Sequence, residues 1–389
     1  MKNQLLILAA LALALFSCQS KESEILTTPL SEQNLEFEIY DSLVVDYLGN
    51  LVLMDISPNR NTFLLMDQNT DTILVTNSKG RILFKYKKEG EGPGNYTGSR
   101  WGNARFLNES DYLLPTFSGF FHFELDGTLL KKYQLDFTPH AVLTIPNNDN
   151  FILKDQKFYT NLSGRGVDEF GTSGLEYQKK SFQMEILDLE TGKFASAIRF
   201  PKSSKYSSTE KSYSDLEFYR NLTSTEDSLF LSFRNEPKIF GYSFSNLNTE
   251  PSSKPIPFPN FIQKEPTDKN PKEGFSLNDL FLGTINEMIS ISNQLFLIDY
   301  LQGLTKDEFD DVLSRAGGDT NKTFDLAEGI NKGGWVLFDG ENISLPILKP
   351  EPLGSFNKFI SKDEIWFSLN FSKEENDYSV IYKTRLVQK

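Results

Sequence analysis

Short strand-like segments separated by turn residues recur from about residue 35 to the end of this 389-residue chain. In the clearest case the pair Asp126-Gly127 stands between two runs rich in alternating apolar residues, 120–125 and 129–135. An Asp-Gly pair in that position is typical of a β-hairpin. The pattern returns in about six units of about 60 residues each. One unit cannot bury both apolar faces of its own sheet, whereas units stacked around a common axis can.

Aromatic residues make up 13% of the chain, a composition that favours strands over helices. We therefore predict an all-β fold, a six-bladed β-propeller of four-stranded antiparallel blades over residues 34–389. The strand-like segment from Leu35 to Tyr40 lies apart from the first full unit. We predict that it pairs with the C-terminal unit and closes the ring.

One helix-containing insertion is predicted at about residues 302–332. Thr305 stands three residues before Glu308, which is the spacing of a capping box, and Leu304 and Phe309 occupy the positions of a hydrophobic staple. A pair of glycines then ends the predicted short helix. A loop of this length is either functional or a cover over exposed core.

The first 17 residues have the layout of a cleavable export signal, with a basic residue, Lys2, and an unbroken apolar run from Leu5 to Phe16. As a helix this run would span roughly 18 Å, which is shorter than the roughly 30 Å hydrocarbon layer of a membrane. We therefore predict a signal peptide over residues 1–17, followed by a flexible tether over residues 18–33.

The stretch from Leu15 to Cys18 resembles the bacterial lipobox, which implies that the Cys18 thiol is acylated and becomes the new N-terminus. An export signal with a chance cysteine is the alternative, but an exported chain with structural thiols would normally carry an even number of cysteines, and this chain has one. The polar stretch from Gln19 to Glu24 resembles the tag that sends lipoproteins of Bacteroidota to the outer face of the outer membrane. We expect a surface-exposed outer-membrane lipoprotein, with a periplasm-facing lipoprotein as the alternative.

The chain carries a formal net charge of −13, and removal of residues 1–17 takes away one positive charge, Lys2, to leave −14. Such a balance repels phosphate backbones, and the sequence has no basic run with interleaved aromatic residues. We therefore expect no nucleic-acid partner.

A glycine-rich segment, Gly90-Glu91-Gly92-Pro93-Gly94, follows the first unit and precedes Tyr96. It resembles the element that ends an early blade in the six-bladed β-propeller lipoproteins of Bacteroidota, which are similar in plan to NHL and TolB-type propellers. Asn95 stands where that family usually has Glu, so the role of that carboxylate is not carried over. The resemblance implies the fold and no particular activity. Taken alone, the segment is a connection between blades and lacks the Lys-Ser/Thr ending of a phosphate-binding loop.

Residues with a known chemistry are few. His122 lies inside an alternating segment, where a packed or cross-strand position is usual, and His140 lies at the entrance to the next unit. The stretch from Asp67 to Asp71 opens like a calcium loop, but Thr72 and Ser78 stand where glycine and glutamate are required. We predict no catalytic residue, metal site or cofactor, although a carboxylate pair contributed by two blades would leave no trace in the sequence.

Propellers commonly bind through loops at one end of the channel, and aromatic rings with arginine are common recognition groups. The cluster of Tyr96, Arg100 and Trp101 is the best binding candidate, and Arg165 and Asp168 in the next long loop are weaker ones. The alternative for Trp101 is that it begins a strand and packs between blades.

These observations favour a cell-envelope lipoprotein that binds a glycan, peptide or protein partner without catalysis. One alternative is an enzyme that cleaves glycans with carboxylates at the channel mouth, for which two or three converging carboxylates would be required. Another is a scaffold in a sensory or assembly complex, docked through the insertion around Phe309.

Overall fold

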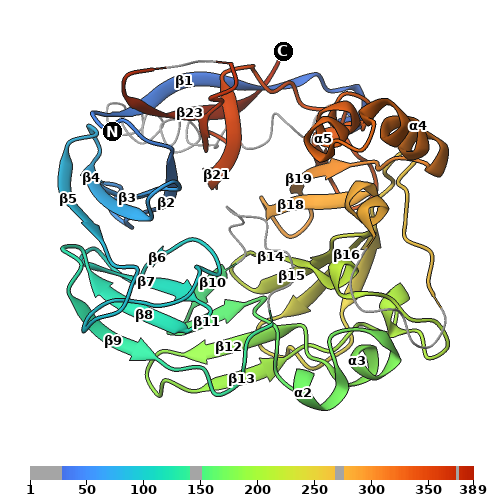
Figure 1. Ribbon diagram of the computed structural model, residues 1–389, viewed down its shortest axis with the longest axis horizontal. Helices are drawn as coiled ribbons and strands as arrows, with labels where there is room; N and C mark the ends of the chain where they lie inside the picture. Colours follow the sequence, from blue (N-terminus) through green and yellow to red (C-terminus); the bar gives the residue numbers. More distant parts are fainter. Residues whose placement is uncertain (1–28, 141–150, 268–275, 374–375) are drawn as a thin grey trace, which may run out of the picture.

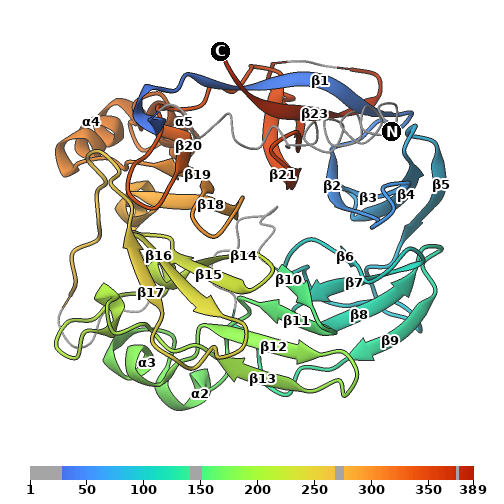
Figure 2. The same ribbon diagram turned by 180° about the vertical axis from the view of Figure 1, so that it is seen from behind.

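The computed structural model describes residues 29–140, 151–267, 276–373 and 376–389. Six antiparallel sheets form a ring around a common axis (Figure 1), and Figure 2 shows the same ring from behind. The predicted six-bladed β-propeller is therefore confirmed. The predicted signal peptide and Cys18 lie outside the described residues.

The strands follow one another from the axis to the rim in each of the first four blades. The first blade contains β2 (Leu51–Ile56), β3 (Thr62–Asp67), β4 (Thr72–Asn77) and β5 (Ile82–Lys87). The second contains β6 (Arg105–Phe106), β7 (Asp111–Thr116), β8 (Gly119–Glu124) and β9 (Leu129–Tyr133). The third contains β10 (Phe151–Lys154), β11 (Lys157–Thr160), β12 (Met184–Asp188) and β13 (Phe194–Ala197). The fourth contains β14 (Arg220–Ser224), β15 (Ser228–Phe233), β16 (Glu236–Ser243) and β17 (Ser252–Pro255).

The sixth blade joins the two ends of the chain, as predicted. Its strands are β21 (Leu353–Ser361), β22 (Glu364–Leu369), β23 (Ser379–Gln388) and, on the rim, β1 (Leu35–Val45). The register of β1 with β23 runs from Leu35 opposite Gln388 to Val45 opposite Ser379 and shifts once, between Ile39 and Asp41. The ring is thus closed by backbone hydrogen bonds between the first and last strands.

The fifth blade has three strands, β18 (Thr284–Ser290), β19 (Phe296–Leu301) and β20 (Gly333–Phe338). An irregular segment runs along β20 in the fourth position. In it Ser344 N donates to Leu337 O at 2.8 Å and Ile347 N donates to Trp335 O at 2.7 Å. The same segment reaches the sixth blade, where Leu348 N donates to Leu35 O.

The insertion between β19 and β20 contains two helices, α4 (Lys306–Ala316) and α5 (Thr320–Glu328), at the rim of the ring (Figure 1). The predicted capping box is present, since Thr305 and Glu308 each accept from the other's backbone N–H. The prediction of one short helix was wrong, because the Asp319 side chain caps a second helix directly after the two glycines. Leu304 and Phe309 are buried in one cluster with residues of both helices and with Phe281, so the pair of helices packs against the connection that precedes β18.

Shorter helical turns lie in the other connections: η2 (Leu30–Glu32), α2 (Val167–Phe170), α3 (Gly174–Lys180), η3 (Lys205–Ser207), η4 (Asp215–Phe218) and η5 (Leu277–Phe281). The described end of the predicted tether is packed, since Leu30 is buried in a cluster with residues of the fifth and sixth blades. Within the four described ranges, no helix has the length and apolar character needed to cross a membrane.

Side chains join the inner strands of neighbouring blades as well. Asn357 Oδ1 of the sixth blade accepts from Leu53 N of the first, and Asp55 Oδ2 of the first accepts from Phe106 N of the second. Asn221 Nδ2 of the fourth blade donates to a backbone carbonyl of β18. Because neighbouring inner strands share no ladder, these polar groups satisfy backbone atoms at the axis and hold the channel wall together.

Candidate functional site

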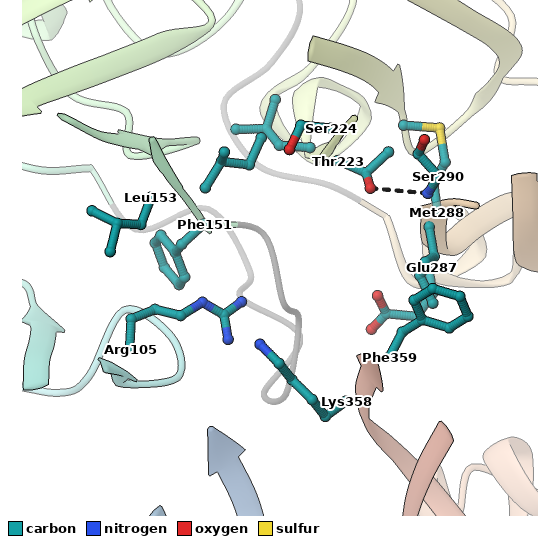
Figure 3. A pocket seen from close by; sticks show the side chains of 13 residues that line it. Arg105, Phe151, Leu153, Thr223, Ser224, Glu287, Met288, Ser290, Lys358 and Phe359 are labelled. Carbon is teal, nitrogen blue, oxygen red and sulfur yellow. Dashed lines mark hydrogen bonds between the residues drawn. The ribbon is translucent and has the colours of Figure 1, made fainter. Parts of the chain in front are cut away.

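A cavity of about 340 Å³ lies in the channel, which we call the channel pocket (Figure 3). Its walls come from five inner strands, β6, β10, β14, β18 and β21. The lining residues are Arg105, Phe151, Ile152, Leu153, Leu222, Thr223, Ser224, Glu287, Met288, Ile289, Ser290, Lys358 and Phe359. Most of them lie near the C-terminal end of the inner strand of their blade. The pocket therefore lies toward the end of the channel at which each inner strand turns into the second strand of its blade.

Two cations of the lining share one carboxylate. Lys358 Nζ lies 2.9 Å and Arg105 Nη1 lies 3.5 Å from Asp55 Oδ1, while the other oxygen of Asp55 accepts from Phe106 N at 2.8 Å. The side chains of Arg105, Asp55 and Lys358 are only 8, 8 and 13% exposed. Three blades thus contribute to one buried charged cluster, in which Asp55 holds both cations at the pocket wall.

Burial and charge act against each other in this cluster. Burial alone would raise the pKa of Asp55, but Lys358 and Arg105 outweigh it and hold this pKa below its ordinary value. Burial, together with the charge of Arg105, lowers the pKa of Lys358 to about 8 although Asp55 opposes the shift. Lys358 is therefore mostly protonated at pH 7 and loses its charge a little above that.

The opposite wall carries a carboxyl group, that of Glu287 on β18, and Figure 3 shows it directed toward the same space as Arg105 and Lys358. Burial raises the pKa of Glu287 well above its ordinary value, and neighbouring Asp299 adds to the effect. Asp299 lies opposite Glu287 on β19, and burial raises its pKa to about 6 even though Asn286 Nδ2 donates to it. The protonated form of Glu287 is favoured, so this wall adds a hydrogen-bond donor more than a negative charge.

The remaining lining is divided between hydroxyl and apolar groups. Thr223, Ser224 and Ser290 provide hydroxyls, and Thr223 Oγ1 accepts from Ser290 N at 3.0 Å across the fourth and fifth blades. Phe151 and Phe359 provide aromatic surface. Among the described lining residues Glu287 is the single carboxylate, so the converging carboxylates required for the glycan-cleaving alternative do not occur there.

The first group of predicted binding residues lies between blades and away from the channel pocket. Tyr96 is 1% and Trp101 8% exposed, and Arg100 lies 3.5 Å from Asp71. Trp101 Nε1 donates to Asn161 Oδ1 of the third blade. The alternative interpretation, in which Trp101 packs between blades, describes this position; binding through these residues stays a prediction.

The second group lies in the connection after β11. Arg165 binds Glu185 and Asp136, with its Nε 3.0 Å from Glu185 Oε1, and its guanidinium stacks on the ring of Phe137. Asp168 is exposed on α2. The structure thus does not bring these two residues together with Tyr96, Arg100 and Trp101 in one pocket, and the binding role of Arg165 and Asp168 also remains a prediction.

Of the charged residues at the channel pocket, Asp55 is the one that stands out in the sequence. It interrupts an otherwise apolar strand, Leu51–Ile56, and a charged residue at an inner strand must face the channel or a partner. In the described part of the chain, no group of three or more His, Cys, Asp or Glu side chains is placed to hold a metal ion.

No protein-family model and no curated protein matches the sequence. Solved structures do match over most of the chain. One is a member of the DUF4221 family from Bacteroides vulgatus, with a TM-score of 0.56 and 10% identity over 92% of this chain and 100% of that chain. Another is a protein of Bacteroides fragilis described as exported, with a TM-score of 0.50 and 14% identity over 93% of this chain and 98% of that chain. At these identities the likeness shows the fold alone, and it confirms the predicted similarity to propellers of Bacteroidota.

Proposed function

We propose that this chain is a binding protein of the bacterial cell envelope, and that its channel pocket holds the carboxylate group of a small ligand without transforming it. The observation that carries the proposal is the placement of two cations from different blades, Arg105 and Lys358, at the wall of one small cavity. Among the described lining residues Glu287 is the single carboxyl group, whereas two cations, three hydroxyl groups and two aromatic rings are available to hold a ligand.

The electrostatics favour an anionic ligand. A cation that is shielded from water interacts strongly with an incoming carboxylate, because little solvent screens the pair. Asp55 fixes the direction of both cations before the ligand arrives, so little side-chain freedom is lost on binding. The raised pKa of Glu287 keeps a second negative charge away from the opposite wall at neutral pH.

The size and the other lining groups narrow the ligand further. Ligand pockets commonly enclose about 300 to 1,000 Å³, so a cavity of about 340 Å³ accommodates one sugar ring or one to two amino-acid residues. The hydroxyls of Thr223, Ser224 and Ser290 suit the polar edge of such a ligand and Phe151 its apolar face. Two sources share this chemistry: an acidic sugar of an envelope glycan and the C-terminal carboxylate of a peptide.

The proposed location depends on two supports. The stretch from Leu15 to Cys18 resembles a lipobox, and one protein with the same fold is described as exported. We therefore assign lipid attachment to Cys18 and the propeller to the outer face of the outer membrane. Metabolic labelling with a radioactive fatty acid tests this: label should appear in the wild-type protein and be absent after Cys18→Ser, and equal labelling of both would contradict it.

Calorimetric titration of the purified protein with a glucuronate-terminated oligosaccharide and with a dipeptide tests the binding function. Lys358→Met should weaken binding of the carboxylate ligand by at least about tenfold, which corresponds to about 1.4 kcal/mol. Lys383→Met is the matched control, because Lys383 is a partly buried lysine of the same blade that pairs with Glu364 and does not line the pocket.

The two titrations also distinguish the ligand sources. Binding of the oligosaccharide alone assigns the site to acidic sugars, and binding of the dipeptide alone assigns it to peptide ends. Absence of binding in both, or equal affinities of the wild-type and Lys358→Met proteins, would refute the proposal. Release of a shortened oligosaccharide would show the glycan-cleaving enzyme instead.

A further inference from the structure

A second cleft lies between the first and sixth blades, at the opposite end of the propeller from the channel pocket. Three connections contribute to it: the β1–β2 loop, the β3–β4 turn and the described parts of the β22–β23 connection, residues 370–373 and 376–378. Its volume is about 950 Å³, and it is lined by Leu48, Gly49, Asn50, Asn69, Phe371, Asn376, Asp377 and Tyr378. We call it the loop cleft. The β1–β2 loop lies at the beginning of β2, the inner strand of the first blade, whereas the channel pocket lies near the ends of the inner strands. The two cavities therefore lie at opposite ends of the propeller.

The β1–β2 loop beside the loop cleft is held from both blades. Asp67 of the first blade accepts from Tyr47 Oη at 2.8 Å, from Asn50 N at 3.2 Å and from Asn69 N at 3.1 Å. From the sixth blade, Ser379 Oγ lies 2.8 Å from the carbonyl oxygens of both Tyr47 and Gly49. The β1–β2 loop therefore has a defined shape although it lies at the surface.

Glycine is required at position 49 for this shape. A Cβ atom there would lie 2.4 Å from the ring of Tyr47 and 3.1 Å from the carboxyl carbon of Asp67. Any larger residue would displace the ring that Asp67 holds, and with it the β1–β2 loop.

The lining combines exposed apolar groups with amides. Leu48, Phe371 and Tyr378 are 77, 44 and 43% exposed, and three such side chains around one concave surface are unusual unless they meet a ligand. Asn50 and Asn69 add amide groups, each of which offers both donors and an acceptor. None of the eight lining residues is a cation, and Asp377 is the single anion.

We infer that the loop cleft binds a neutral oligosaccharide. A pyranose ring has an apolar face of C–H groups, which packs on an aromatic ring, and an edge of neighbouring hydroxyls, which pair with the donor and acceptor of one amide. A cleft of this volume holds more than one sugar unit. Among the eight described lining residues there is no cation, and Asp377 is present, which disfavours acidic ligands; the channel pocket has the opposite preference. This inference does not depend on the function proposed for the channel pocket.

The test measures binding of a panel of neutral glucan, mannan and xylan hexasaccharides to the wild-type protein by biolayer interferometry. We expect at least one of them to bind, and Tyr378→Ala to weaken that binding by about tenfold or more. Tyr40→Ala is the matched control, because Tyr40 is also a tyrosine, is 42% exposed and lies on rim strand β1 outside the cleft. Gly49→Ala should also weaken binding, because it alters the β1–β2 loop and keeps the aromatic ring.

The inference is supported if binding is lost in Tyr378→Ala and Gly49→Ala and retained in Tyr40→Ala and Lys358→Met. Circular dichroism must show that all four variants are folded. If no neutral hexasaccharide binds, or if Tyr378→Ala binds as well as the wild type, the inference is overturned. Loss of binding in Lys358→Met alone would place the oligosaccharide in the channel pocket and would also overturn it.

Discussion

Replacing Asp55 by asparagine would remove one negative charge from the channel wall and keep the shape of the side chain. The amide oxygen can still accept from Phe106 N, so the link between the first two blades is preserved. What changes is the environment of Arg105 and Lys358, which lose the carboxylate that they share at 3.5 and 2.9 Å. Asp55→Asn therefore isolates the charge of the cluster from its packing.

The expected cost follows from the protonation of the two cations. Lys358 can respond by releasing its proton, because burial and the charge of Arg105 lower its pKa to about 8 even with Asp55 present, and loss of Asp55 lowers it further. Arg105 stays charged, so the loss of its attraction to Asp55 destabilises the folded state. Removal of one partner from a buried charged pair typically costs about 3 to 5 kcal/mol. Because Lys358 can become neutral, we expect a value at the lower end of this range, a loss of about 3 kcal/mol in the free energy of unfolding.

Urea denaturation of the purified protein at pH 7, followed by tryptophan fluorescence and circular dichroism, measures this loss. Asp310→Asn is the matched control, because Asp310 also pairs with a lysine, Lys306, but on the exposed surface of α4. We expect no measurable change for the control. A loss below about 1 kcal/mol for Asp55→Asn, or one equal to that of the control, would refute the view that the cluster is a buried network.

Three further predictions follow from single side chains. Because the pKa of Lys358 is about 8, carboxylate binding to the wild type should weaken between pH 7 and pH 9, whereas binding to Lys358→Arg should persist at pH 9. Titration calorimetry at both pH values measures this, and equal pH profiles of the two proteins would contradict it. Phe37 is fully buried and packs on the side chains of Trp335 and Phe367 where the propeller closes. Phe37→Ala should therefore lower the free energy of unfolding, measured by urea denaturation, by about 3 to 5 kcal/mol. A loss under about 1 kcal/mol would argue against a role in closure. Trp101→Phe removes one buried hydrogen bond and should lower the free energy of unfolding by about 1 to 3 kcal/mol, with the affinity for the carboxylate ligand unchanged. A loss of affinity would instead favour the binding role predicted from the sequence.

The ring and its closure could be predicted because each depends on a local pattern. Alternating apolar residues and Asp-Gly turns specify hairpins, and the separate segment at Leu35 had no strand to pair with except one at the far end of the chain. The first helix of the insertion was predicted for the same reason, since its capping box and staple lie within six residues, Leu304 to Phe309. The second helix was missed because its start, Asp319, follows directly after a glycine pair that indicates an end.

The channel pocket could not be predicted, because its residues come from five strands that are far apart in the sequence. Arg105, Glu287 and Lys358 each lie in a short segment that mixes polar and apolar residues. Such a residue has no local partner that would identify it. The burial of Trp101 was difficult to predict for a related reason. Trp101 follows a glycine-rich connection, which suggests an exposed loop. Its backbone N–H nevertheless donates to Pro115 O, and its ring packs between blades.

A crystal structure of the protein soaked with the carboxylate ligand of highest affinity would test the channel pocket most directly. We predict that the carboxylate oxygens lie within hydrogen-bonding distance of Arg105 and Lys358, with the rest of the ligand against Phe151 and the hydroxyl groups of the opposite wall. A ligand bound at another place, or an empty channel pocket at a concentration far above the dissociation constant, would contradict the account.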